Sequence, residues 1–153
     1  MSGTLEVYRH STVGFEIPLP TGWKLSEEQE GCALVAVEPP REEPHLRASV
    51  VVTIEAPAAE QSFDEWTERS VTALGDSLNR LRVIDDEPVE IAGAPARRVL
   101  SHYVHPQFGG VNLEQWLLAH GGLGYTISCS SAALEYDDVH EVMSAIAEGM
   151  RPA

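Results

Sequence analysis

The stretch VNLEQWLLAHGGLGYTISCSS, residues 111–131, decides the fold class of this chain. It reads as two extended segments joined by the glycine-rich turn at 121–124, a pattern typical of a β-hairpin. In the first segment Leu113 and Leu117 point to one side of a strand, and Trp116 points to the other. A strand that is apolar on both sides needs cover on both faces of its sheet, so we expect a sheet with a layer packed on each face.

The residues before this stretch extend the hairpin into a meander. Residues 96–104 have a strand pattern and lead into a loop at 105–110, which contains proline and two glycines. Three strands joined by short glycine-containing loops predict an antiparallel meander over 96–131. Further short strands are predicted from β-branched and alternating runs at 5–8, 12–17, 23–25, 32–38, 48–56, 82–85 and 89–91. The prolines that follow the 12–17 run are expected to end that strand.

Two amphipathic segments predict helices. Residues 62–81 open with Ser62 and Glu65 in the spacing of a capping box, and their apolar residues recur at the helical period. Residues 134–150 repeat the apolar period, with a serine at 130–131 as the candidate cap. The sequence therefore predicts an α+β fold, a three-layer α/β/α sandwich with a central, mainly antiparallel sheet and one helix on each face.

The composition is that of an acidic globular protein. Its 153 residues suit one domain, residues 1–153. Lys+Arg 10 and Asp+Glu 24 give a net charge of -14, which repels phosphate backbones, so we expect no nucleic acid partner. No apolar run approaches the ~20 residues of a spanning helix, so no membrane insertion is expected. The N-terminus lacks the pattern of an export signal, which predicts a cytoplasmic location.

Four motifs resemble those of a known superfamily. FEIPLPTGW at 15–23, SFDEW at 62–66, VEIAGAPA at 89–96 and YTISCSS at 125–131 are similar to segments of the PsbP-like and Mog-like superfamily. The chain most resembles its bacterial branch of unknown function. This resemblance implies an α/β/α sandwich and a non-enzymatic role without shared catalytic residues. Members include a photosystem accessory subunit, a binder of a nuclear-transport GTPase and chaperone-like adaptors.

Residue patterns specific to catalysis or cofactor binding are missing. His102, His105 and His120 are the candidate metal ligands, but the first two differ in strand parity and no cysteine accompanies them. Cys32 and Cys129 lie in predicted strands and read as buried free thiols. Neither a phosphate loop nor a Gly-x-Ser-x-Gly nucleophile motif occurs. We therefore expect no catalytic residues, no cofactor and no tightly bound metal.

One face of the meander is partly polar where a pure core would be apolar. His102, Glu114 and Trp116 share one strand parity, and Phe108 lies in the loop beside two glycines. These four residues are the predicted contacts to a partner, which is either another protein or a second copy of this chain. A sheet edge, a core with satisfied polar groups, or a Phe108 folded back over the sheet are the structural alternatives.

Two classes of function stay open at this point. The first is a non-catalytic binding or adaptor domain that acts through protein–protein contacts, in a chaperone-like or accessory role. The second is a small-ligand or metal-binding protein, or an enzyme, whose site is assembled from residues distant in sequence. A flat patch or shallow groove favours the first class, whereas a pocket of clustered titratable groups favours the second.

Overall fold

The computed structural model describes residues 4–41, 45–57 and 60–153, and these contain nine β-strands, two α-helices and one 3-10 helix. Five strands precede α1, and four more separate it from η1 and α2. The elements are β1 (Leu5–Arg9), β2 (Glu16–Pro20), β3 (Lys24–Ser26), β4 (Leu34–Val37), β5 (Ser49–Glu55), α1 (Phe63–Ser77), β6 (Arg82–Ile91), β7 (Ala94–His105), β8 (Gly109–His120), β9 (Leu123–Ala132), η1 (Ala133–Glu135) and α2 (Tyr136–Glu148).

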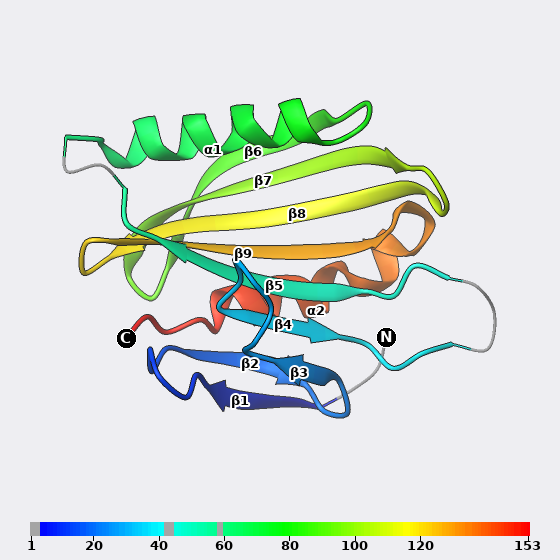
Figure 1. Ribbon diagram of the computed structural model, residues 1–153, viewed down its shortest axis with the longest axis horizontal. Coiled ribbons are helices and arrows are strands. Elements are labelled where there is room, and N and C mark those ends of the chain that lie inside the picture. The colour runs from blue at the N-terminus through cyan, green and yellow to red at the C-terminus, as the bar shows by residue number, and fades with distance from the viewer. Residues whose placement is uncertain (1–3, 42–44, 58–59) are drawn as a thin grey trace.

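Seven of the strands form one sheet in the order β3-β4-β5-β9-β8-β7-β6, and every neighbouring pair is antiparallel. β1 and β2 form a separate two-stranded antiparallel sheet. Figure 1 shows the long strands of the large sheet with α1 on one side in this view and α2 on the other. The expected α+β class with a mainly antiparallel sheet and two helices is confirmed.

The meander is also confirmed, and its turns follow the glycines. In the β8–β9 turn Gly121 and Gly122 have φ of 59° and 79°, the left-handed values that a two-residue hairpin turn requires. Gly109, with φ of 80°, closes the β7–β8 hairpin. The β6–β7 turn uses Ala92 and Gly93 in the same left-handed region, so the meander has four strands, one more than predicted.

Two strands continue through prolines that the sequence-based prediction treated as strand ends, because both strands lie at an edge. Residues 82–91 form one strand instead of two, although Pro88 lies within it, and a register shift between Val83 and Asp85 marks a bulge. β2 likewise continues through Pro18 and Pro20 instead of stopping there. Proline lacks an N–H, which costs no hydrogen bond when that position faces away from the only neighbouring strand.

Both helices are shorter than predicted. α1 has the predicted capping box, in which Ser62 Oγ accepts from the Glu65 N–H, but it ends at Ser77 instead of Leu81. After Ser77 the chain leaves the helix, and Asn79 exchanges two hydrogen bonds with Val104 at the end of β7. At α2 the predicted serine cap is wrong, because residues 130–131 remain in β9 and the η1 turn intervenes.

The core is divided between the two faces of the large sheet. The main cluster joins α2, the β1–β2 hairpin and one side of the sheet, and it includes Trp116, Leu118 and Met143. A smaller cluster joins Trp66 of α1 to Leu117 and Val99 (both buried). Neighbouring residues of β8 thus belong to different clusters, as the alternation of side chains along a strand requires.

Among the described residues, no helix is long and apolar enough to span a bilayer.

Candidate functional site

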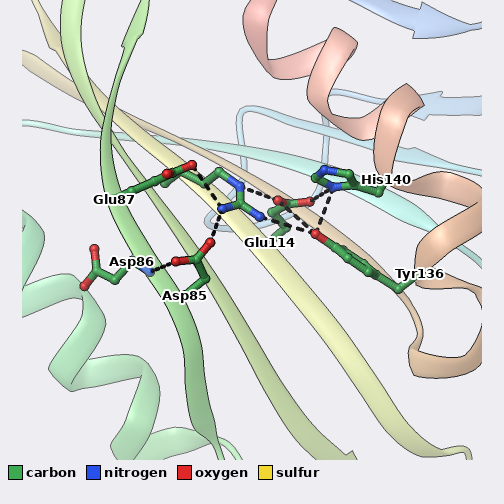
Figure 2. A network of polar contacts seen from close by, with 7 residues as sticks. Asp85, Asp86, Glu87, Glu114, Tyr136 and His140 are labelled. Carbon is green, nitrogen blue, oxygen red and sulfur yellow. Dashed lines mark hydrogen bonds and ion pairs between the residues drawn. The ribbon is translucent and has the colours of Figure 1, made fainter.

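A buried carboxylate lies at the centre of the most extensive polar network among the described residues. Glu114 of β8 is 1% exposed, and its Oε2 accepts a hydrogen bond of 2.5 Å from Arg98 Nε of β7. Its Oε1 lies 3.1 Å from His140 Nδ1, and Tyr136 Oη donates to Oε2 over 3.2 Å. Figure 2 shows that Tyr136 and His140 approach the carboxylate from the α2 side. A buried charge requires such partners, because an unpaired one would be very costly.

Arg98 extends the network from the interior to the sheet edge. Its Nη1 donates to Asp85 over 2.8 Å and to Glu87 over 3.2 Å, both on β6. Burial acts to lower the pKa of Arg98, but the hydrogen bond to Asp85 and the charge of Glu114 outweigh burial and raise it. Three carboxylates therefore share one guanidinium, whose charge is fully engaged within the protein.

The network sets the protonation of Tyr136 and orients the ring of His140. Burial, followed by the charge of Glu114, raises the pKa of Tyr136 to about 12, so its hydroxyl stays protonated at neutral pH. His140 Nδ1 faces Glu114 Oε1, an acceptor, which favours the tautomer with hydrogen on Nδ1. The other ring nitrogen of His140, Nε2, has no hydrogen-bond partner among the described residues.

The chemistry of this network falls short of a nucleophilic site. A nucleophile needs its hydroxyl or thiol within hydrogen-bond reach of a base. In the described part of the chain no serine, threonine or cysteine side chain hydrogen-bonds to His140, whose hydroxyl neighbour is Tyr136. The arrangement binds β6, β7, β8 and α2 together and lines one side of a cavity of about 290 Å³ between α2 and the sheet.

The preceding residue, Arg97, makes a corresponding cluster toward α1. Its guanidinium contacts the Asp86 carboxylate over 2.9 and 2.5 Å and Glu68 of α1 over 2.7 Å. It also donates to Thr67 Oγ1 over 3.0 Å. The hydrogen bond from Arg97 lowers the pKa of Asp86. Two successive arginines of one strand therefore link the sheet edge to two different helices, because successive side chains point to opposite sides.

A larger groove lies between α1 and the sheet, next to β5 and β9. It has a volume of about 610 Å³, and its sheet side is lined by hydroxyl and amide groups, including Thr126, Ser128 and Gln115. Trp66 closes one end, and its indole N–H donates to Glu55. The groove is within the size range of small-molecule sites, but its lining is more polar than that of a typical drug-sized pocket.

A third polar cluster stabilises the β1–β2 turn. His10 Nδ1 accepts from the Val13 backbone N–H at 3.0 Å, and its Nε2 donates to the Ala33 carbonyl at 2.9 Å. Nearby, Glu27 accepts hydrogen bonds from Ser11 and Tyr8, which lower its pKa to about 2. This cluster ties the β1–β2 turn to Glu27 and Ala33, and we assign it to the stability of the turn.

The structure separates the four predicted partner contacts into two pairs. Trp116 is 3% exposed and Glu114 1%, so both lie in the interior. The buried position of Glu114 matches the structural alternative of a core in which the polar groups are satisfied. His102 and Phe108 are half-buried at the β7–β8 hairpin end, where the Phe108 ring lies 4.9 Å from that of His105. Trp116 is therefore not accessible to a partner, whereas Phe108 is in part.

The candidate metal ligands do not meet. His105 Nδ1 accepts from the Gln107 and Phe108 backbone N–H groups, and His120 is exposed at the far end of β8. Within the described residues no three His, Cys, Asp or Glu side chains are grouped to hold a metal ion. Both cysteines are free, as expected; burial raises the pKa of the Cys129 thiol, but Cys32 is half-buried because β4 begins only after it.

Sequence reasoning missed Arg98, Tyr136 and His140 as members of the central network. One signal was available, because two arginines in succession inside an otherwise apolar strand require partners on both sides of a sheet. The partners themselves come from β8, from α2 and from the edge strand β6, and no sequence spacing links α2 to β7.

The comparisons with known proteins identify the fold. No family model and no curated protein matches the sequence. Cyanobacterial PsbP from Synechocystis sp. PCC 6803 is 14% identical, with a TM-score of 0.73 over 100% of this chain and 95% of that one. The Ran-binding protein Mog1p of Saccharomyces cerevisiae is 14% identical, with a TM-score of 0.68 over 99% and 96%. A protein of unknown function from Pseudomonas aeruginosa is 14% identical, with a TM-score of 0.67 over 99% of both chains. The chain therefore has the PsbP/Mog1-like fold that its sequence motifs resemble.

Proposed function

We propose that this chain is a non-catalytic binding or adaptor domain that acts through protein–protein contacts. The observation that carries the proposal is the exposure of large apolar side chains at the β7–β8 hairpin end of the sheet, where Leu134 is 99% exposed and Ile84 57%. Covering such side chains with a partner removes apolar surface from water. The description of one structure of this fold, Mog1p, as a Ran-binding protein supports the same class of function.

The proposed contact surface, the hairpin-end surface, consists of Ile84, His102, Phe108 and Leu134. Three elements meet there, because a side chain built on Gly110 of β8 would touch both His102 of β7 and Ala133 of η1. In Figure 1 the β7–β8 hairpin and the segment leading into α2 lie at the same end of the sheet. Glu114 and Trp116, which the sequence also proposed as contacts, would act from the interior by holding the strands that present this surface.

The proposal includes the architecture and the setting of the domain. Residues 1–153 would act as one three-layer domain with one helix on each face, an arrangement supported by the two core clusters and by the opposite directions of Arg97 and Arg98. The net charge of -14 supports a protein partner over a nucleic acid, and a cytoplasmic location is part of the proposal. The partner is either a different protein or a second copy of the chain.

The test begins with affinity purification of the native protein and a light-scattering measurement of its mass in solution. Once a partner or a dimer is found, Phe108→Ala and Leu134→Ala are expected to weaken binding, by ~2 kcal/mol for a central aromatic anchor. Val7→Ala is the matched control, since Val7 is 69% exposed on β1, outside the hairpin-end surface. If both test variants stay within ~0.5 kcal/mol of the parent while folding is intact, the hairpin-end surface is not the interface.

Small-ligand binding is the second candidate, and the groove between α1 and the sheet favours it. A volume of about 610 Å³ suits a small molecule, and its hydroxyl and amide lining suits a neutral polar one. Native mass spectrometry of protein purified from its source separates the candidates. A bound small molecule of defined mass supports the second candidate, whereas a stoichiometric protein partner supports the first.

A further inference from the structure

The groove between α1 and the sheet stays open because α1 presents mostly short side chains to it. Trp66 packs on the sheet at one end of the groove and is only 3% exposed. Beyond it the helix contributes Ser70, Ala73 and Ser77, which are too short to fill the space above the strands. Both serine hydroxyls donate to carbonyls of the helix itself, so they do not bridge to the sheet. A cavity of about 610 Å³ remains.

The floor of this groove is formed by four polar side chains on three neighbouring strands. Thr53 of β5 lies opposite Thr126 of β9, and Gln115 of β8 lies opposite Ser128 of β9, so all four point to the α1 side of the sheet. Gln115 Nε2 donates to Ser128 Oγ over 3.0 Å. Both threonine hydroxyls, the hydroxyl hydrogen of Ser128 and the amide oxygen of Gln115 have no hydrogen-bond partner among the described residues.

Thr126 is the member of this floor that points most directly to an occupant. Its side chain is polar, the residue is only 9% exposed, and it lines the groove. In the described part of the chain, the polar side-chain atoms that are sealed from solvent without a partner lie elsewhere, so Thr126 Oγ1 is reached through the groove. Valine would fill the same space without an unsatisfied hydroxyl, which is costly when buried. The missing hydrogen bond is therefore one that a molecule in the groove can supply.

The charges and the free polar groups of the groove favour an uncharged ligand that both donates and accepts. Its lining holds one carboxylate, Glu55, and one guanidinium, Arg69, so it carries no net charge in a chain whose net charge is -14. A carboxylate can only accept hydrogen bonds and an ammonium group can only donate them. The floor offers hydroxyl hydrogens beside the amide oxygen of Gln115, and a ligand hydroxyl can satisfy both kinds of group.

We propose that this groove binds a neutral polyol of about the size of a monosaccharide. The hydroxyl groups of the ligand would lie on the floor of Thr53, Thr126, Ser128 and Gln115, and its carbon skeleton would face Leu74 of α1. The proposal rests on the ligand-binding candidate above and names the class of ligand. It is independent of the hairpin-end surface, whose residues do not line the groove.

The experiment is a titration by heteronuclear NMR with glycerol, myo-inositol and glucose. A polyol from this set is expected to shift the Trp66 indole and the backbone amides of Thr53, Thr126 and Ser128 in a saturable way. Cyclohexanol, which has the carbon ring of inositol with a single hydroxyl, and glucuronate, in which a carboxylate replaces the terminal hydroxymethyl group of glucose, are expected to bind more weakly. If none of the three polyols gives saturable shifts at these positions, or if cyclohexanol or glucuronate binds as well as the polyols, the proposal is wrong.

Thr126→Val tests the floor directly, because it keeps the shape of the side chain and removes the unpartnered hydroxyl. It is expected to weaken polyol binding about fivefold to tenfold, while urea unfolding shows a stability equal to that of the parent or higher. Thr21→Val is the matched control, since Thr21 is exposed in the β2–β3 turn and does not line the groove. Equal polyol affinities of these two variants would overturn the proposal.

Native mass spectrometry separates this proposal from the ligand-binding function on which it rests. If protein from its source carries a small molecule of another class, and that molecule shifts the same groove amides, the ligand-binding function stands and the polyol assignment fails. If the native protein carries only a protein partner and none of the polyols binds, both fail.

Discussion

Replacing Glu114 by glutamine tests whether the central network holds the fold together. The substitution keeps the size of the side chain but removes a charge that is 2% exposed and lies 2.5 Å from Arg98 Nε. With its amide oxygen in the place of Oε2, the glutamine can still accept from Arg98 and Tyr136, but its NH₂ group then faces Nδ1 of His140 where an acceptor stood before. Removing one partner of a buried ion pair leaves the other charge uncompensated, which typically costs 3–5 kcal/mol.

The expected loss is at the low end of that range, because Arg98 keeps its contacts to Asp85 and Glu87 at the sheet edge. We expect the free energy of unfolding to fall by about 3 kcal/mol, which corresponds to a Tm about 6–12 °C lower for a chain of this length. Urea unfolding followed by tryptophan fluorescence measures the change.

Glu87→Gln is the control for this prediction. It removes a carboxylate from the same guanidinium, but the Glu87 side chain is 50% exposed, and a solvated ion pair contributes about 1 kcal/mol or less. If Glu114→Gln and Glu87→Gln destabilise the protein by the same amount within ~0.5 kcal/mol, burial of the network does not matter as argued here.

Three further predictions concern local packing, pH and metal content. Gly124→Ala is expected to destabilise the fold by ~1–3 kcal/mol, because the new Cβ would lie 2.4 Å from Trp66 Cζ2. Gly75→Ala, at an uncrowded position of α1, is expected to stabilise the fold by up to ~1 kcal/mol. Equal changes in the free energy of unfolding, measured in urea, would contradict this. Hydrogen bonds lower the pKa of Glu27 from 4.5 to about 2, so the stability they provide is complete above pH 4.5 and is lost as pH falls toward 2. Urea midpoints measured across that interval should fall less steeply in Glu27→Gln, and an unchanged slope would refute the assignment. Elemental analysis of protein prepared without a histidine tag is expected to find no stoichiometric transition metal, and one equivalent would overturn that expectation.

Local signals in the sequence were enough for most of the secondary structure. Gly93 in the 92–93 turn and the glycine pair at 121–122 placed hairpin turns because few residues adopt left-handed backbone cheaply, and the capping box at 62–65 placed the start of α1. The prediction failed where the free-energy cost of a proline in a strand depends on whether a neighbouring strand needs a hydrogen bond from that position. Pro88 and Pro18 read as strand breaks, but at the edges of their sheets they remove no hydrogen bond.

The candidate sites were beyond prediction for the same reason. Glu114 was noticed as a polar residue on an apolar strand, yet its parity alone did not show whether it met solvent or a buried guanidinium. That answer depends on His140 and Tyr136, which are separated from Glu114 by more than twenty residues and reach it only when α2 packs on the sheet. Leu134 likewise was the first residue of a predicted helix and is instead exposed in the η1 turn.

The sequence by itself determined the class of fold, the antiparallel meander, the acidic charge and the two free thiols, because each depends on composition or on residues close together in the chain. Tertiary structure alone decided that Trp116 is covered, that Arg98 joins three carboxylates, and that Arg97 and Arg98 reach different helices. These features depend on which faces of distant segments come together, and the free energy of such contacts exists only after the chain has closed the loops between them.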